Sequence, residues 1–277
     1  MSPLYTEVRG SGPTLVLLHG WGLNLRVWDG LAAALSDRFR TVAVDLPGHG
    51  RSEWLPQRSS LEAQAAQVAE TVSAISPSYS LLGWSLGAQI ALRLAAREGR
   101  ALTEGARAAS GPERLVLIAA TPRFSTGPDW PHGAPPERLD QQALALRTDY
   151  RGMVSDFLEL QVRGCLDGAA ALAQLRAALF AHGSEAPGHQ LAALASDLEL
   201  LRHTDLRPLL GRIPLPSLVV AGQYDRVTLP AASHALANAL PNGRYVEIRR
   251  AAHAPFLSHL AELAALLVDF LLPRPPQ

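Results

Sequence analysis

The chain has 277 residues, of which 48% are hydrophobic and 18% are charged, a composition that excludes a disordered chain and allows one large domain or two small ones. Its 25 basic and 25 acidic residues leave a formal net charge of zero, so no overall charge favours nucleic acid or an anionic membrane. The single Cys165 excludes an intramolecular disulfide and a cysteine-built metal site. Because no signal peptide and no apolar run of about 20 residues is found, we expect a cytoplasmic protein.

Short runs of Val, Leu and Ile with few polar residues recur along the chain, as is typical of parallel strands covered on both faces. The predicted strands span 14–19, 41–45, 79–83, 115–119, 217–222 and 244–248. Stretches with helical periodicity separate them, and the predicted helices span 27–36, 61–75, 86–98, 231–240 and 255–271. This alternation predicts an α/β fold with a mostly parallel sheet flanked by helices.

The segment 122–208 contains no strand-like run and is rich in Ala, Leu, Gln and Arg. Its periodicity predicts four helices, over 139–146, 154–162, 169–180 and 190–201. We therefore expect a core formed by 1–121 and 209–277 and a helical cap formed by 122–208. The segment 100–111 is interpreted as a surface loop, and the proline-rich tail 273–277 is expected to fray.

The pentapeptide Gly83-Trp-Ser-Leu-Gly87 matches the pattern G-x-S-x-G between a predicted strand and a predicted helix. This context is the one that a nucleophile elbow requires, because a tight strand-to-helix turn leaves little room for side chains at the two glycines. Ser85 is thus the candidate nucleophile. A serine hydroxyl is a weak nucleophile at neutral pH and needs a general base.

His253 is the candidate base, since it follows a predicted strand at the carboxyl edge of the sheet, where open α/β folds bind ligands. The alternative His259 lies within the predicted last helix, and His49 is interpreted as a loop residue. Asp225 is the candidate carboxylate that orients the base, and the order Ser85, Asp225, His253 is typical of this kind of hydrolase.

Acyl transfer also needs donors for the oxyanion. The backbone N–H groups of Leu86, directly after the nucleophile, and of Trp21, in the loop His19-Gly-Trp-Gly22, are the candidates. The indole of Trp21 is expected to wall the acyl pocket. His19 is interpreted as bracing this loop, and Asp45 as holding the turn that contains Gly48 and Gly50.

Five motifs, taken together, resemble α/β-hydrolases with a helical cap and, more narrowly, the carboxylesterase family of biotin synthesis that removes the methyl ester from pimeloyl-acyl carrier protein. The motifs are His19-Gly-Trp-Gly22, Asp45-Leu-Pro-Gly-His-Gly-Arg-Ser52, Gly83-Trp-Ser-Leu-Gly87, Gly222-Gln-Tyr-Asp225 and Ala252-His-Ala-Pro-Phe256. The sequence departs from the family pattern at Ala88, where a second glycine is usual.

The resemblance implies that certain cap residues contact the substrate and its carrier. The substrate-binding residues it implies, besides Trp21, are Phe157, Leu158, Glu159, Leu160 and Gln161. The arginines it implies as contacts for an acidic acyl carrier protein are Arg138, Arg147, Arg151 and Arg163. Asp156, Glu159 and Asp167 lie among these arginines.

The sequence thus predicts a serine carboxylesterase that acts on a small ester, without a metal or organic cofactor, and the resemblance implies that acyl carrier protein presents this ester. We expect a monomer that binds neither nucleic acid nor a membrane. A general short-chain esterase, a lactonase, a carbon–carbon bond hydrolase or an aminopeptidase on the same scaffold remains open, because the fold hosts all of these activities. A catalytically inactive binding protein is the alternative of another class, although all three triad residue types are present.

Overall fold

The structure is a computed structural model that describes residues 3–103, 111–180 and 188–272. Within these residues seven strands form one sheet in the order β1-β3-β2-β4-β5-β6-β7, parallel throughout except for β1, which is antiparallel to β3. The strands are β1 (Thr6–Arg9), β2 (Thr14–Leu18), β3 (Arg40–Val44), β4 (Ser78–Trp84), β5 (Gly111–Ile118), β6 (Ser217–Gly222) and β7 (Gly243–Ile248). The predicted α/β class with a mostly parallel sheet is confirmed.

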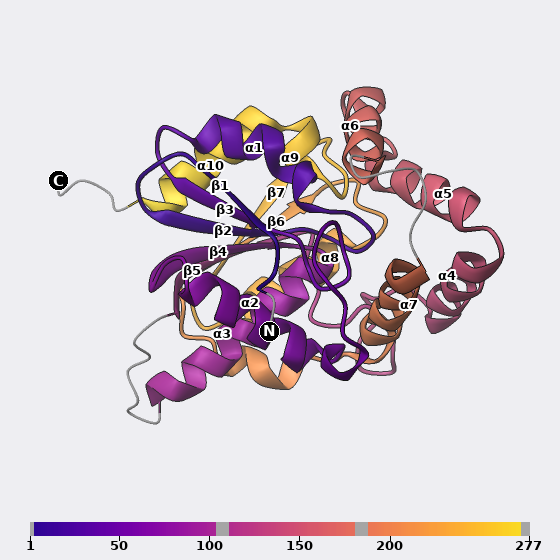
Figure 1. The fold of residues 1–277 in the computed structure, drawn as a ribbon, viewed down its shortest axis with the longest axis horizontal. Coiled ribbons are helices and arrows are strands. Elements are labelled where there is room, and N and C mark those ends of the chain that lie inside the picture. The colour runs from indigo at the N-terminus through magenta and orange to yellow at the C-terminus, as the bar shows by residue number, and fades with distance from the viewer. Residues whose placement is uncertain (1–2, 104–110, 181–187, 273–277) are drawn as a thin grey trace.

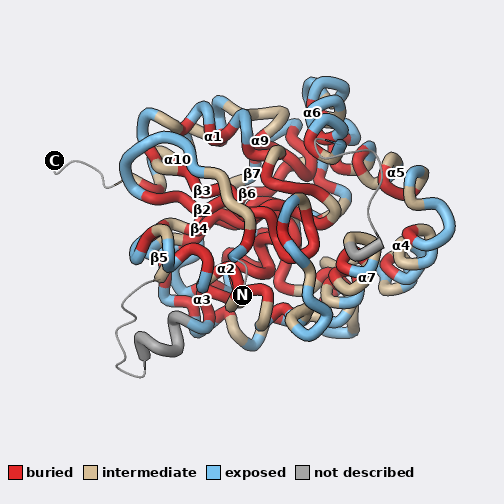
Figure 2. The backbone as a smooth tube through the Cα atoms, in the orientation of Figure 1, coloured by how far each residue is buried: buried red, intermediate tan, exposed pale blue. Residues whose placement is uncertain are grey.

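Helices cover both faces of this sheet, which explains why the central strands are apolar along their whole length (Figure 1). One face carries α1 (Asp29–Leu35), α9 (Pro255–Ser258) and α10 (Leu260–Leu271). The helices that pack from the other side or along the strands β6 and β7 are α2 (Leu61–Ser73), α3 (Leu86–Thr103) and α8 (Pro230–Ala239). Figure 2 shows the buried strands enclosed by helices whose outer turns are exposed.

Three details differ from the sequence-based expectation. The strand β1 was not predicted, because its sequence Thr-Glu-Val-Arg is polar and it lies half exposed at the sheet edge. The predicted helix 255–271 is interrupted at His259, whose backbone leaves the helical region between α9 and α10. The predicted helix 27–36 begins as a 3₁₀ turn, Leu25–Trp28, before α1.

Four helices lie between β5 and β6 in the chain and pack together beside the carboxyl ends of the strands (Figure 1). They are α4 (Pro136–Thr148), α5 (Tyr150–Val162), α6 (Gly168–Phe180) and α7 (Gly188–His203). The four predicted cap helices are thus present, each slightly longer than expected. We retain, as a proposal, the division into core 1–121, cap 122–208 and core 209–277.

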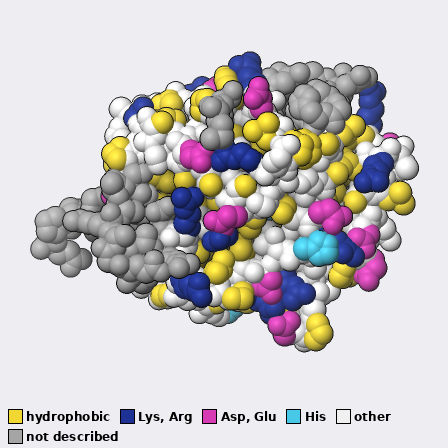
Figure 3. Space-filling model, turned by 60° about the horizontal axis from the view of Figure 1, so that its bottom comes forward, with side chains coloured by type: hydrophobic (Ala, Val, Ile, Leu, Met, Phe, Trp, Pro, Cys, Tyr) yellow, Lys and Arg dark blue, Asp and Glu magenta, His cyan; other side chains and the backbone are white. Residues whose placement is uncertain are grey.

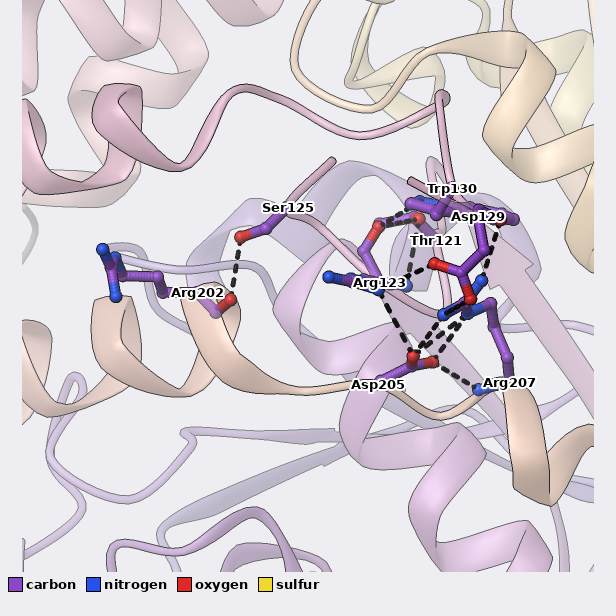
Figure 4. Close-up of polar contacts among 8 residues, drawn as sticks. All are labelled: Thr121, Arg123, Ser125, Asp129, Trp130, Arg202, Asp205 and Arg207. Atoms are coloured by element: carbon purple, nitrogen blue, oxygen red, sulfur yellow. Dashed lines mark hydrogen bonds and ion pairs between the residues drawn. The ribbon is translucent and has the colours of Figure 1, made fainter. Parts of the chain in front are cut away.

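The two segments that join the cap to the core are bound to each other (Figure 4). The Arg207 guanidinium lies 2.6 Å from a carboxylate oxygen of Asp205 and 2.9 Å from one of Asp129. Arg123 lies 3.7 Å from Asp205, and the Leu206 N–H donates to the Pro122 carbonyl. These contacts tie the chain leaving the core to the chain returning to it, so the base of the cap is held as one unit.

The predicted loop 100–111 lies largely outside the described residues, although α3 reaches Thr103 and β5 begins at Gly111. The tail 273–277 lies outside them entirely. Among the helices of the described residues, none is long and apolar enough to cross a membrane. Acidic and basic side chains are intermixed over the face seen in Figure 3, in keeping with the balanced charge of the chain.

Candidate active site

Ser85 lies at the turn between β4 and α3 in a strained backbone conformation. Its φ of +56° falls in the left-handed region, which a residue with a side chain adopts only under constraint. The Ser85 N–H donates to the Ile118 carbonyl at 3.1 Å, which fixes the turn against β5. A Cβ atom on Gly83 would collide with the Gly87 carbonyl, and one on Gly87 with the Leu18 carbonyl. The turn therefore has the shape that the G-x-S-x-G pattern predicts.

Asp225 and His253 form a buried hydrogen-bonded pair. The Nδ1 atom of His253 lies 2.8 Å from Asp225 Oδ2, and both side chains are almost fully buried. The other carboxylate oxygen, Oδ1, accepts the N–H groups of Val227 and Thr228 at 2.8 and 2.9 Å. Since the carboxylate accepts at Oδ2, Nδ1 carries the ring proton and Nε2 is left with a free lone pair.

The loop of His253 is held from the core and from the cap. The Trp84 indole donates to the His253 carbonyl at 2.8 Å, and the His253 N–H donates to the Gln161 carbonyl at 2.9 Å. The buried Nε2 atom makes no hydrogen bond within the described residues. The structure therefore shows no hydrogen bond between Nε2 and Ser85 in the part of the chain that it describes; in serine hydrolases this contact often forms fully only when substrate binds. The alternative His259 instead lies 2.9 Å from the Ser258 hydroxyl.

The loop His19–Gly22 packs against the nucleophile turn. A Cβ atom on Gly20 would lie 3.3 Å from the Ser85 Cβ, so glycine allows this backbone to approach. Leu86 is the first residue of α3, where a helix leaves backbone N–H groups unpaired. The loop that contains Trp21 and the first turn of α3 thus both adjoin Ser85, and the N–H groups of Trp21 and Leu86 remain the candidate oxyanion donors.

Two neutral histidines, His19 and His49, hold this loop through hydrogen bonds to backbone N–H groups. His19 Nε2 accepts the Leu46 N–H at 3.0 Å, and His49 Nε2 accepts the Gly22 N–H at 3.2 Å. Burial lowers the pKa of His19 to about 4, and burial together with the neighbouring His19 lowers the pKa of His49 to about 3. Both rings thus serve as uncharged hydrogen-bonding groups in the structure of the loop.

Asp45 fastens the adjoining turn, as the sequence predicted. Its two carboxylate oxygens accept the N–H groups of Leu25 and Arg51 at 2.8 and 2.9 Å. A Cβ atom on Gly50 would collide with the same carboxylate. Asp45 is therefore engaged in the structure of the turn, whereas Asp225 is the carboxylate beside His253.

A mostly apolar cavity with about 460 Å³ of empty space, counting its open mouth, lies over Ser85 between core and cap. Its lining consists of Trp21, Ser85, Phe124, Ala134, Arg138, Leu139, Gln142, Phe157, Leu198, Leu201 and Val227. The Trp21 and Phe157 rings meet edge to face with centroids 5.3 Å apart. A groove on the cap surface between α4 and α5 shares Arg138, Gln142 and Phe157 with this cavity, so the two hollows adjoin.

The segment predicted to bind substrate divides among several environments. Phe157 lines the cavity, Leu160 lines the adjoining groove, and Leu158 is buried within the cap. Glu159 lies on the surface and pairs with Arg176 at 3.2 Å. The Gln161 side chain is buried without a hydrogen bond in the described structure, while its carbonyl holds His253.

The four cap arginines lie on or next to α4 and α5. Arg138 lines the cavity, and Arg147, Arg151 and Arg163 are exposed. Sequence reasoning did not identify the cavity residues Leu139, Gln142, Leu198 and Leu201 as part of the site. Their i, i+3 spacing on α4 and α7 would have placed each pair on one helix face, although it could not say what that face covers.

No group of three or more His, Cys, Asp or Glu side chains arranged to hold a metal ion occurs among the described residues.

Comparison with known proteins identifies the family. A family model described as alpha/beta hydrolase fold matches residues 13–260. A protein of Stenotrophomonas maltophilia named pimeloyl-[acyl-carrier protein] methyl ester esterase is 38% identical, over 97% of this chain and 96% of its own. A protein of Nitrosomonas europaea with the same name is also 38% identical, over 93% and 95%.

An esterase from Exiguobacterium antarcticum shares the fold with a TM-score of 0.83 at 23% identity, over 97% of this chain and 95% of that chain. The resemblance drawn from the sequence motifs is thereby confirmed. The chain belongs to the alpha/beta hydrolase fold family and, within it, to the family of the pimeloyl-[acyl-carrier protein] methyl ester esterases.

Proposed function

We propose that this chain, a carboxylic ester hydrolase by its family, hydrolyses the methyl ester of pimeloyl-acyl carrier protein and so frees the pimeloyl carboxylate for biotin synthesis. The observation that carries the proposal is the position of Ser85. It lies at a strained elbow that opens into a mostly apolar cavity, and that cavity adjoins a groove on the cap surface. An aliphatic acyl chain attached to a large carrier needs an apolar pocket for the chain and a route toward the carrier, and the cavity together with the adjoining, more polar groove supports this arrangement.

In the proposed mechanism the Ser85 hydroxyl attacks the ester carbonyl while His253 Nε2 takes its proton. Asp225 keeps Nδ1 protonated and stabilises the imidazolium that forms. The N–H groups of Trp21 and Leu86 stabilise the oxyanion. His253 then returns the proton to the departing methoxide, which leaves as methanol.

Deacylation repeats these steps with water as the nucleophile. His253 takes a proton from the water as it attacks the acyl-enzyme, and passes that proton to Ser85 as the ester bond to the enzyme breaks. The products are the free carboxylate and the regenerated serine. None of these steps requires a metal or an organic cofactor.

The cap supplies the proposed contact with the carrier. The arginines of this surface are Arg138, Arg147, Arg151 and Arg163. Two acidic side chains of the same helices are engaged elsewhere, Asp140 with Arg202 of α7 and Glu159 with Arg176 of α6. Their engagement lessens the opposing charge next to the arginines and supports attraction of an acidic carrier, against which Asp149 and Asp156 of the same groove act.

Growth of a biotin-requiring bacterial strain that lacks its own methyl ester esterase tests the proposal. Expression of this chain should restore growth without biotin, and expression of Ser85→Ala should not. A panel of p-nitrophenyl esters should show hydrolysis of short to medium acyl chains by the intact chain. Hydrolysis of these esters without rescue of growth would instead support a general short-chain esterase.

We also propose that the protein works as a cytoplasmic monomer. Light scattering of the purified protein should give a mass near the 29.6 kDa of one chain.

A further inference from the structure

A buried carboxyl group without a cation lies where the cap meets the core, outside the proposed catalytic groups. Asp197 on α7 is 1% exposed. Its Oδ1 accepts the Gln64 amide of α2 at 2.7 Å, and its Oδ2 makes no hydrogen bond within the described residues. His49 Nε2 lies 3.8 Å from Oδ2.

His49 cannot serve as the missing cation. Its Nε2 already accepts the Gly22 N–H, and its Nδ1 lies 3.1 Å from the Pro47 carbonyl, to which it must donate as the neutral tautomer. Burial raises the pKa of Asp197 to about 7, although the Gln64 hydrogen bond acts in the opposite direction. An ionised carboxylate buried with one donor and no cation is costly, so this position favours the protonated form.

Charged side chains on the elements around Asp197 are engaged with other partners. On α2, Glu62 pairs with Arg93 and Glu70 pairs with Arg58. On the cap, Asp140 of α4 pairs with Arg202, and Glu199 of α7 pairs with His203. On the core side, Asp45 accepts two backbone N–H groups and His19 is neutral. The charge state of Asp197 is therefore set mainly by its burial.

The face of α7 that carries Asp197 also supports the site. Leu194, one turn earlier, accepts the Trp21 indole N–H at its carbonyl, at 3.0 Å. Leu198 and Leu201 line the cavity over Ser85. Leu194, Asp197, Leu198 and Leu201 stand at positions i, i+3, i+4 and i+7 of α7 and so lie on one face of the helix. A displacement of α7 therefore moves all four together.

The neighbouring turn packs tightly against the same helix. A Cβ atom on Gly48 would collide with the Ala193 side chain of α7. His49 follows Gly48 and holds the Gly22 N–H, next to Trp21. Any displacement of α7 at Asp197 therefore reaches the loop of the proposed oxyanion donor by two routes, through the Trp21 indole and through the His49 turn.

We propose that Asp197 is a positioning residue for the ester hydrolysis proposed above: without charge it seats α7 against the core and fixes the loop of Trp21, and with a charge it favours release of α7. The buried position without a cation, the contact of α7 with the Trp21 indole and the lining of the cavity by the same helix face carry this inference. Water can reach the ionised carboxylate only if α7 moves away from the core. This movement would widen the cavity over Ser85 and break the contact between α7 and the Trp21 loop.

The test compares wild type, Asp197→Asn and the control Glu199→Gln, which neutralises an exposed acid of the same helix. We measure kcat/KM on a p-nitrophenyl ester from pH 6 to 9. Protonation of the general base affects all three proteins alike, so the informative quantity is kcat/KM divided by that of Asp197→Asn at the same pH. For wild type and Glu199→Gln this ratio should fall above neutral pH, by up to about tenfold between pH 6 and 8, the change in protonated fraction of one group of pKa about 7. Asp197→Asn is the reference because its side chain cannot ionise.

A second substitution separates positioning from simple packing. Asp197→Ala removes the acceptor for Gln64 and should raise KM and lower kcat at every pH, because α7 lines the cavity and holds the Trp21 loop. Asp197→Asn, which keeps an acceptor oxygen, should restore both constants at pH 6. Equal pH profiles of wild type and Asp197→Asn would overturn the proposal.

A readout without turnover distinguishes failure of this inference from failure of the proposed function. In protein with ¹⁵N-labelled tryptophan, the Trp21 indole signal, assigned with Trp21→Phe, should titrate near pH 7 in wild type and not in Asp197→Asn. If Ser85→Ala kept full esterase activity, the proposed function would fail, while this titration would still judge Asp197. An indole signal independent of pH in wild type would overturn the role of Asp197.

Discussion

Replacing Asp225 by asparagine should disable the general base His253 without disturbing the fold. Because Oδ1 accepts two backbone N–H groups, the asparagine must place its carbonyl oxygen there and turn its NH₂ group toward His253 Nδ1, now 2.8 Å away. The amide then donates to Nδ1, which forces the ring proton onto Nε2. Nε2 can no longer take the proton of Ser85.

The same change in a serine protease lowers kcat by about 10⁴, equivalent to roughly 5.5 kcal/mol of transition-state stabilisation at 1.36 kcal/mol per decade. We expect a loss of this order in initial-rate hydrolysis of a p-nitrophenyl ester. The melting temperature should stay within a few degrees of wild type, because both backbone hydrogen bonds remain. A variant that kept more than about a tenth of wild-type kcat would refute the reasoning, since a tautomer-trapped histidine cannot act as the base.

Three further predictions concern the base, the buried acid and the cap. His253→Ala should abolish esterase activity and His259→Ala should reduce it only mildly; the reverse order in the same assay would mean that His259 is the base. Folding raises the pKa of Asp197 from 3.8 to about 7, so between these pH values the native state holds a proton that the unfolded state has lost. The free energy of unfolding therefore falls as pH rises from 4 to 7, by up to roughly 4 kcal/mol. Chemical denaturation should therefore show the free energy of unfolding of Asp197→Asn rising relative to that of wild type from pH 4 to 7, with no further rise above pH 7. A difference between the two free energies that stays constant across this range would contradict the assignment. KM for a carrier-bound ester should rise with salt and in the double variant Arg147→Glu, Arg163→Glu, because exposed charges are screened beyond about 8–10 Å at physiological salt. KM for a p-nitrophenyl ester, which has no carrier, should respond to neither change. Equal responses of the two substrates would argue against carrier recognition by the cap.

The central sheet could be predicted from the sequence because its strands are buried on both faces and therefore read as short, nearly unbroken apolar runs. β1 could not, since an edge strand facing solvent has no such pattern. The interruption at His259 was hidden for a similar reason: the apolar periodicity of 255–271 continues through a local change of backbone that carries no compositional signal.

The candidate triad was predictable because parallel strands bring their carboxyl ends to one edge of the sheet, so residues far apart in sequence meet there. The pairing of Asp225 with His253, across 28 positions, follows from this rule. The contact between Gln64 and Asp197, across 133 positions, does not, because it depends on how the cap rests on the core. Apolar periodicity predicts the helix that carries Asp197 but not the element it covers.

Mass spectrometry of pimeloyl-acyl carrier protein methyl ester incubated with the purified chain tests the central claim most directly. The account predicts loss of one CH₂ unit from the carrier-bound substrate with release of methanol, complete with wild type and absent with Ser85→Ala. An unchanged substrate mass, under conditions in which the same preparation hydrolyses a p-nitrophenyl ester, would contradict it.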